Sequence, residues 1–440
     1  MERSAVASHV IGSEGPEMRK GLDPTRNGIV AGLDVGCSKV CCFIARADDG
    51  VLPRVVGIGQ QASHGVKGGV VGDMAAVEAA VRNAVHAAEQ MAGETIDRVI
   101  VNLSGGHPAS SAVGIEVAIN GHAVSDADLR RAFAQGREAQ GLNGEGDGRR
   151  ELIHSIPIAY NIDGNRGVRD PRGMYARHLS VDMHIVTAAS GAVRNLTTCI
   201  ERCHLDIAGY VVSPYASGLA VLVEDEMELG VTVIDMGGGT TTIAVFYEGN
   251  VVFTDVVPVG GIHVTNDIAR GLSTALTHAE RMKTLYGHAL ATGTDEREMI
   301  DVPRVGEEND GNGHQVPRSL LVGIIQPRLE ETLELVRSHL EASGFDKIAG
   351  RRAVLTGGAC QLPAMTELAG LILDKQVRIG RPGRIAGLAE ATAGPAFATC
   401  AGLLNYAVTA DQDAPLKAAA ETGEPDGLMG RFGHWIREHF

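Results

Sequence analysis

VTVIDMGGGTTTIAVF, residues 231–246, predicts a β-hairpin whose turn is rich in glycine. In dinucleotide-binding and P-loop proteins the phosphate loop opens onto a helix, whereas these glycines lead directly back into a strand. Glycines allow main-chain N–H groups to approach an anion, and threonine hydroxyls add further donors. The candidate phosphate-binding residues are Gly237, Gly238, Gly239, Thr240 and Thr241.

Asp235 ends the first strand of this hairpin, where it would lie beside bound phosphates. A carboxylate in that place is unfavourable unless a cation lies between the two anionic groups. The position therefore predicts Mg²⁺ held through water.

The same pattern occurs once more at residues 32–45, GLDVGCSKVCCFIA. A second acidic residue, Asp34, precedes a second glycine turn at the same offset, and the equivalent phosphate-binding candidates are Gly36, Ser38 and Lys39. One glycine-containing hairpin is ordinarily a simple turn. Two such hairpins far apart in the sequence indicate a duplicated fold that binds a nucleotide polyphosphate between two lobes.

Composition limits the classes of function. The net charge of −15 and the pI near 5.5 argue against a nucleic-acid partner. The seven cysteines contain no CxxC pair, so neither a zinc site nor a disulfide framework is indicated, and a reducing cytosol fits best. Residues 1–27 lack an apolar run and predict a disordered tail instead of a signal peptide. No apolar stretch is long enough to span a bilayer.

Several elements are predicted between and after the hairpins. An inserted subdomain is expected at residues 111–193, a long polar loop at 291–317 and a helix at 327–343 that begins at its proline. Residues 393–406 predict a closing apolar helix. Between a strand and a helix, Gly357 and Gly358 form a turn that can contact a nucleotide through its backbone.

The last residues differ from the rest of the chain. After a polar linker at 409–426, residues 427–440 (GLMGRFGHWIREHF) place most of their large apolar side chains on one face of a helix. This pattern favours a helix that lies in a membrane interface over a tail helix docked on its own domain. A single copy of this helix would bind the membrane reversibly. Many copies on one polymer would bind firmly, because the polymer raises their effective concentration at the membrane. The membrane-facing candidates are Leu428, Met429, Phe432, Trp435, Ile436 and Phe440.

The hairpins, the turn at Gly357 and the glycine-containing closing helix resemble the actin and heat-shock chaperone ATPase superfamily. The matching motifs are residues 32–45, 210–222, 231–246, 353–363 and 393–406. Within this superfamily the chain is similar to the FtsA family of bacterial cell-division proteins. That similarity rests on IHSIPIAYNIDG (153–164), DPRGMYARHLSVDMHIVT (170–187), PVGGIHVTNDIARGL (258–272), AERMKTLYG (279–287) and IIQPRLEETLELV (324–336).

The resemblance implies an α/β, duplicated ribonuclease H-like (actin-like ATPase) fold of two lobes that binds ATP and Mg²⁺. It implies that Glu280 and Lys283 face the ribose and adenine, although their spacing alone indicates a surface ion pair. The implied division of the chain is a tail at 1–27; a first lobe core at 28–110, 194–222 and 386–408; an insert at 111–193; a second lobe core at 223–265 and 350–385; a helical subdomain at 266–349; a linker at 409–426; and a membrane-targeting helix at 427–440.

The resemblance also implies partners and a location. The helical subdomain would receive the C-terminal tail of the tubulin homologue FtsZ, with Arg318 and Arg328 as candidates for meeting its acidic residues. The insert would contribute to filaments of the chain with itself. The terminal helix would tether these filaments to anionic lipids on the cytoplasmic face of the inner membrane at the septum, where further divisome proteins would join.

Two positions depart from the pattern. Hydrolytic relatives carry Gln or Glu where Ser213 stands, so the candidate catalytic set Asp34, Asp235 and Ser213 predicts at most a slow ATPase. Thr242 replaces an aspartate that is common in the family. The alternatives are a pilus-assembly actin homologue, a soluble phosphotransferase and a chaperone ATPase of the same superfamily.

Overall fold

A computed structural model describes residues 28–47, 52–138, 149–303, 305, 314–383 and 385–412. The predicted tail at 1–27, most of the linker and the predicted membrane helix at 427–440 lie outside the described residues.

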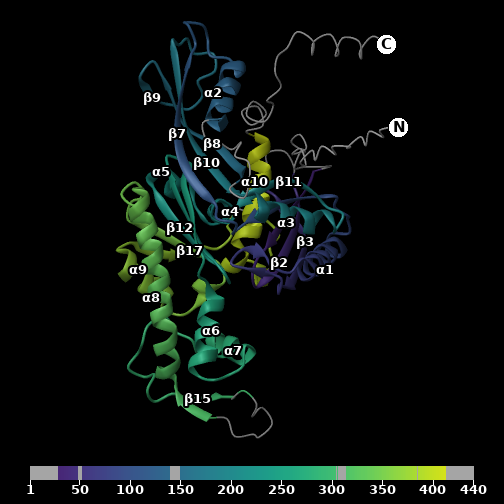
Figure 1. The fold of residues 1–440 in the computed structure, drawn as a ribbon, viewed down its shortest axis with the longest axis vertical. Coiled ribbons are helices and arrows are strands. Elements are labelled where there is room, and N and C mark those ends of the chain that lie inside the picture. The colour runs from purple at the N-terminus through teal and green to yellow at the C-terminus, as the bar shows by residue number, and fades with distance from the viewer. Residues whose placement is uncertain are drawn as a thin grey trace, which may run out of the picture.

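Two five-stranded sheets share one topology, which confirms the duplicated, two-lobed α/β fold (Figure 1). In each sheet three antiparallel strands are followed by two parallel ones, in the orders β3-β2-β1-β6-β11 and β14-β13-β12-β17-β18. The first sheet contains β1 (Ile29–Val35), β2 (Lys39–Arg46), β3 (Arg54–Ala62), β6 (Arg98–Leu103) and β11 (Asp206–Val212). The second contains β12 (Val231–Met236), β13 (Thr241–Tyr247), β14 (Asn250–Val257), β17 (Arg352–Thr356) and β18 (Gln376–Ile379).

Both predicted glycine hairpins are confirmed, and their turns are closed in the same way. Gly36 N donates to Lys39 O at 3.0 Å in the first hairpin, and Gly237 N donates to Thr240 O at 2.9 Å in the second. The strands on either side are buried almost throughout, because each sheet is covered on both faces.

Helices cover the sheets and connect the lobes. Two of them, α4 and α10, pack against each other between the lobes, and a Cβ on Gly402 of α10 would overlap the carbonyl oxygen of Ala216 in α4. Glycine is therefore required at this crossing. The helices are α1 (Met74–Ala92), α3 (Ser190–Glu201), α4 (Ser213–Val221), α5 (Glu224–Leu229), α6 (Gly261–Gly271), α7 (Leu276–Tyr286), α8 (Arg318–Ser343), α9 (Met365–Leu373) and α10 (Ala398–Gln412).

The insert is a separate layer at one end of the molecule, opposite the end formed by α6, α7 and α8 (Figure 1). Its sheet has the order β7-β10-β8-β9, and its own apolar core includes Phe133, Leu179 and Met183. The elements are β7 (Ala109–Ala118), α2 (Asp126–Glu138), β8 (Arg150–Ile162), β9 (Asn165–Val168) and β10 (His178–Ala189).

Three local predictions were wrong. Helix α8 begins at Arg318 and contains Pro327 in its interior, where the lost hydrogen bond falls on exposed Gly323. Instead of one long loop, β15 (Met299–Val302) pairs with β16 (His314–Pro317), because their buried residues complete the core beside α8. The closing helix starts only at Ala398, because Pro395 lies in a separate 3₁₀ turn before it. The carbonyl oxygen of Pro395 accepts a hydrogen bond from Gly357 N at 3.1 Å.

Candidate nucleotide site

The glycine turns of the two lobes lie against each other. A Cβ on Gly238 would lie 2.8 Å from Ser38 Oγ, and a Cβ on Gly239 would collide with Cys37 Sγ. The structure thus brings together the two sets of predicted phosphate-binding residues. Thr241 faces the second lobe instead, because its Oγ1 donates to Val259 O at 2.8 Å.

The two predicted magnesium carboxylates are both buried beside these turns. Burial raises the pKa of Asp34 to about 7; the nearby charge of Lys39 opposes this rise and that of Asp235 adds to it. Burial also raises the pKa of Asp235, against hydrogen bonds that favour its charged form. Two buried carboxylates that repel each other form a site where a cation would be favourable.

Sequence reasoning missed the hydroxyl groups that hold Asp235. Ser217 Oγ in α4 donates to Asp235 Oδ2 at 2.5 Å, and Thr399 Oγ1 in α10 donates to the same oxygen at 2.9 Å. Both residues lie inside superfamily motifs of the sequence, Ser217 in residues 210–222 and Thr399 in residues 393–406. Their positions within these motifs are the signal that could have found them.

Lys39 bridges the first hairpin to the segment before α10. Its Nζ donates to Ala396 O at 2.6 Å and lies 3.4 Å from the ring centroid of Phe397. The ammonium therefore has partners of its own while its charge acts on both aspartates.

The N-terminus of α6 packs onto the second turn, a contact that the sequence did not reveal. Gly261 N donates to Gly237 O at 3.0 Å, and Ile262 N donates to Gly238 O at 2.8 Å. A Cβ on Gly260 would lie 2.7 Å from the carbonyl oxygens of both turn residues, so glycine is needed there.

Glu280 and Lys283 lie next to this helix start. Lys283 Nζ donates to Gly261 O at 3.1 Å, to Thr265 Oγ1 at 2.9 Å and to Glu280 Oε2 at 2.6 Å. The Lys283 side chain is only 13% exposed, whereas that of Glu280 is 54% exposed. The pair is thus more than a surface contact, and its role toward the ribose and adenine stays a prediction.

Gly357 lies directly against Asp235 at the site. Its φ of +85° and the contact that a Cβ would make with Asp235 Oδ1 restrict this position to glycine. A Cβ on Gly358 would have 3.9 Å to its nearest neighbour, Ala396, so this residue borders open space.

Ser213 is buried at the start of α4 and linked to the first hairpin. Asn102 Nδ2 donates to Ser213 Oγ at 3.1 Å, while Asn102 Oδ1 accepts from Val35 N at 2.7 Å. Asn102 was missed because nothing in the local sequence marks it. A catalytic role for Ser213 stays a prediction.

The two arginines predicted to meet a partner lie elsewhere, on α8. Arg318 Nη1 is 2.9 Å from Glu298 and 3.3 Å from Asp295. Arg328 Nε is 2.5 Å from Asp267, and its Nη1 also pairs with Glu331. Any partner carboxylate would have to exchange with these intrachain ones.

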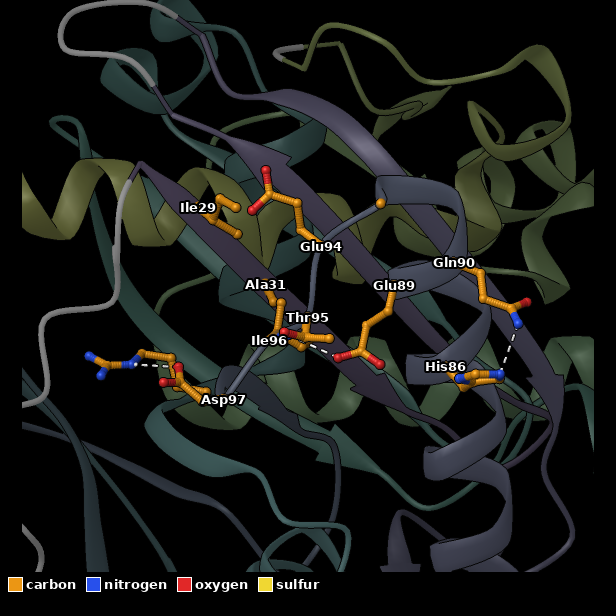
Figure 2. A pocket seen from close by; sticks show the side chains of 11 residues that line it. Ile29, Ala31, His86, Glu89, Gln90, Glu94, Thr95, Ile96 and Asp97 are labelled. Carbon is orange, nitrogen blue, oxygen red and sulfur yellow. Dashed lines mark hydrogen bonds and ion pairs between the residues drawn. The ribbon is translucent and has the colours of Figure 1, made fainter.

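A cavity of about 780 Å³ lies away from all of these residues, between the end of α1 and the starts of β1 and β6 (Figure 2). Glu89, Glu94 and Asp97 line it, and Glu89 accepts from Ile96 N at 2.9 Å. Polyphosphates bind where N–H donors and glycine turns gather, so we place the candidate site between the hairpins and not in this acidic cavity.

Within the described residues, no three acidic, histidine or cysteine side chains gather as a metal cage. Among the helices that the structure describes, none combines the length and apolar character needed to cross a membrane.

Comparison with known proteins assigns the family. The model described as "Cell division protein FtsA" matches residues 232–402, and that of the "SHS2 domain inserted in FTSA" matches residues 105–187. The cell division protein FtsA of Agrobacterium fabrum is 46% identical over 436 residues, covering 96% of this chain and 97% of that protein. The chain belongs to the FtsA family of cell-division proteins. The Escherichia coli K12 FtsA is 31% identical, covering 95% of this chain and 100% of its own length.

Solved structures confirm the actin-like fold. A PilM–PilN type IV pilus biogenesis complex matches with a TM-score of 0.62 at 17% identity, covering 86% of this chain and 98% of that one. MreB5 of Spiroplasma citri bound to ADP matches with a TM-score of 0.52 at 13% identity, covering 88% and 98%. At these identities the likeness concerns the fold alone, whereas the FtsA relatives favour cell division over the pilus, phosphotransferase and chaperone alternatives.

Proposed function

We propose that this FtsA-family chain binds Mg·ATP between its lobes, polymerises on the cytoplasmic face of the inner membrane and tethers FtsZ filaments to it at the septum, where it helps to recruit later divisome proteins. The observation that carries the nucleotide part is the apposition of the two glycine turns at Ser38 and Gly238 beside two buried aspartates.

The donor set fits a polyphosphate and its metal. The N–H groups of the turns at 36–39 and 237–240 would hold the phosphates, and Asp34 and Asp235 would hold Mg²⁺ through water. When bound, the metal neutralises phosphate charge and so allows both carboxylates to ionise together. MreB5, a protein of this fold, was solved with ADP bound, which agrees with this use of the fold.

Hydrolysis is expected to be slow, and nucleotide would act chiefly as a ligand for polymerisation. Ser213 Oγ already accepts from Asn102 Nδ2, and a hydroxyl positions an attacking water less well than a carboxylate or amide. Phosphate release from the intact chain should therefore be slow, and Ser213→Gln should accelerate it. Rapid release by the unmodified chain would contradict this assignment.

The FtsZ tail would bind beside Arg318. This arginine donates from Nε to Tyr286 O, and exposed apolar side chains occur next to its contacts, namely Leu285, Tyr286, Met299 and Leu320. Within this apolar surface, Arg318 would meet a short acidic peptide with apolar anchors by exchanging Asp295 or Glu298 for a carboxylate of the peptide. We expect Arg318→Ala and Arg328→Ala to weaken binding of an FtsZ C-terminal peptide in fluorescence anisotropy, and Arg337→Ala on the same helix to leave it unchanged. Equal affinity for all three variants would remove both arginines from the proposal.

Membrane attachment is tested by co-sedimentation with anionic liposomes, with and without Mg·ATP. We compare the intact chain, a version that ends at Asp426 and the variant Trp435→Glu. The truncation retains every described residue, because α10 ends at Gln412. Pelleting of the intact chain alone supports the anchor, and enhancement by ATP supports polymerisation. An intact chain that stays in the supernatant would mean that residues 427–440 dock on the protein instead.

A further inference from the structure

Asn102 joins the first phosphate hairpin to the start of α4. Its Oδ1 accepts from Val35 N at 2.7 Å, and its Nδ2 donates to Ser213 Oγ at 3.1 Å. The side chains of Asn102 and Ser213 are both buried. Because Val35 follows Asp34 directly, this one amide connects the hairpin of a candidate magnesium ligand to the candidate catalytic serine.

The two hydrogen bonds fix the direction in which the amide of Asn102 points. A main-chain N–H only donates, so the atom that faces Val35 N must be the carbonyl oxygen of the side chain. The amide nitrogen then faces Ser213, and this nitrogen only donates as well. Ser213 Oγ is consequently the acceptor in this contact, and its own proton points away from Asn102.

The place of Ser213 on α4 puts that proton beside the candidate nucleotide site. Ser213 lies four residues before Ser217, so the two side chains share one face of the helix. On this face Ser217 Oγ donates to Asp235 Oδ2 at 2.5 Å. Among the residues that the structure describes, Asn102 is the one hydrogen-bond partner of Ser213 Oγ. The Ser213 proton is therefore available to a ligand bound between Asp34 and Asp235.

We propose that Asn102 is a positioning residue that acts through Ser213 and keeps hydrolysis slow, because it makes the Ser213 hydroxyl a donor toward the attacking water instead of an acceptor. This inference rests on the proposed binding of Mg·ATP between the lobes. An attacking water must lose a proton, so a group that accepts from it speeds the reaction, whereas a group that donates to it does not. The rate then depends on a residue of β6 as well as on α4.

Exchanging the amide for a carboxylate reverses this polarity. In Asn102→Asp one carboxylate oxygen still accepts from Val35 N, and the ionised group also accepts the Ser213 proton. Ser213 Oγ can then take a proton from the attacking water while its own proton passes to the carboxylate. The water oxygen bonds to the terminal phosphorus, and the bond from this phosphorus to the oxygen of the departing diphosphate breaks.

The first test measures phosphate release from Mg·ATP by the intact chain at pH 6 and pH 8. Asn102→Asp should release phosphate about tenfold faster at pH 8, and Ser213→Ala should remove this rise. The rise should be smaller at pH 6, because burial raises the pKa of a carboxyl group, as it does for Asp34, and a protonated carboxyl donates to Ser213 as the amide does.

The matched control is Asn405→Asp, the same change at another buried asparagine beside α4. Asn405 Nδ2 donates to Leu219 O at 3.1 Å and makes no contact with Ser213. This variant introduces a buried carboxyl group without changing the partner of the Ser213 hydroxyl. Its rate of phosphate release should equal that of the unmodified chain at both pH values.

The second test needs no nucleotide. In the Asn102→Asp background, Ser213→Ala should lower the urea midpoint more at pH 8 than at pH 5, because a hydrogen bond to an ionised carboxylate is stronger than one to its neutral form. With Asn102 in place the same change should cost equally at both pH values, since an amide does not titrate. Asp34 and Asp235 titrate in both backgrounds and cancel from the comparison. Equal costs in both backgrounds would assign Asn102 a structural role only.

The outcomes separate the inference from the function beneath it. Calorimetry that finds no Mg·ATP binding by the unmodified chain overturns the proposed function and the inference with it. Binding without a pH-dependent rise in Asn102→Asp, or a rise that persists after Ser213→Ala, overturns the inference alone.

A second variant decides if Asn102→Asp unfolds, as judged by circular dichroism. In Asn102→Ala the freed hydroxyl can turn toward the water, so phosphate release should rise about threefold, and Ser213→Ala should cancel that rise. An unchanged rate in Asn102→Ala would overturn the inference.

Discussion

The two lobes have the same strand order and the same turn hydrogen bond, yet they hold their aspartates with different partners. In the first lobe, the charge of Lys39 is the main influence that opposes the burial of Asp34. In the second, Ser217 and Thr399 donate to Asp235 from α4 and α10. Asp34 thus depends on its own hairpin, while Asp235 depends on the helices between the lobes.

The donors to Asp235 connect one side of the site to the helices that lie between the lobes. Because α4 and α10 pack against each other between the lobes, a change in their packing would alter the donors to Asp235, and it would also reach the first hairpin, on which α10 lies (Figure 1). We therefore propose that Asp235, whose donors lie on these two helices, links bound nucleotide to their packing.

Gly402→Ala would disrupt the crossing of α4 and α10 between the lobes. The new methyl group overlaps the backbone of Ala216, so α4 and α10 must separate. Overpacking of this kind costs about 1–3 kcal/mol or more in the free energy of unfolding, which urea denaturation would measure. Gly323→Ala, at an exposed position of α8, is the control and should stabilise the protein by about 0.5–1 kcal/mol. Equal urea midpoints for Gly402→Ala and Gly323→Ala would mean that α4 and α10 are not in close contact at Gly402.

Asp34→Asn should affect stability and binding in opposite directions. Since the folded pKa is raised from 3.8 to about 7, ionisation destabilises the nucleotide-free protein as pH rises between these values. The variant loses this penalty, so its urea midpoint at pH 8 should exceed that of the unmodified chain, by on the order of 2 kcal/mol in unfolding free energy. Its Mg·ATP affinity should fall about thirtyfold or more.

Asp235 retains its own raised pKa, so the pH dependence of Asp34→Asn should be reduced and not abolished. A variant with unchanged stability at pH 8 would show that Asp34 is not buried as a charge. Calorimetry and urea titrations at pH 5 and pH 8 provide both measurements.

Ser217→Ala and Thr399→Val test whether Asp235 of the second lobe depends on its two hydroxyl donors. Each removes a donor to the charged form of Asp235 and so raises its pKa further. We expect each to cost about 1 kcal/mol of Mg·ATP binding, with a larger loss at pH 6 than at pH 8. Thr399→Ser keeps the hydroxyl and should behave like the unmodified chain. A pH-independent loss would assign these hydroxyls a packing role only.

Lys283→Met is expected to have the smallest effect and to act on the nucleoside alone. The ammonium holds Gly261, Thr265 and Glu280 together, so its loss should weaken Mg·ATP binding about threefold. Inorganic tripolyphosphate lacks the ribose and adenine, and its competition for the site should be unaffected. Equal losses for both ligands would place Lys283 at the phosphates instead.

Local patterns in the sequence predicted the parts of the site that are local in the chain. Each hairpin contains its own strands, turn and aspartate, so residues 32–45 and 231–246 indicated both, and their repetition indicated two lobes. Asn102 and Thr399 were missed because their hydrogen-bond partners lie far away in the sequence, and Ser217 was missed because its partner Asp235 follows 18 residues later in another element. Only the places of Ser217 and Thr399 within the superfamily motifs mark these two residues.

The errors in secondary structure have a similar origin. Proline favours the first turn of a helix and so predicts a helix start at Pro327, yet the apolar residues of α8 on both sides of it pack on one core. Tertiary packing outweighed the local cost of the proline. The sequence predicts a polar loop where β15 and β16 lie, because only Ile300, Val302 and Val316 are buried in these two strands.

We propose that one nucleotide contacts both hairpins at once. Hydrogen exchange of the intact chain, followed by mass spectrometry with and without Mg·ATP, tests this contact. We expect ATP to slow exchange at residues 36–39 and 237–241 together. Protection confined to one turn, or protection only around Glu89 and Glu94 at the acidic cavity of Figure 2, would contradict it.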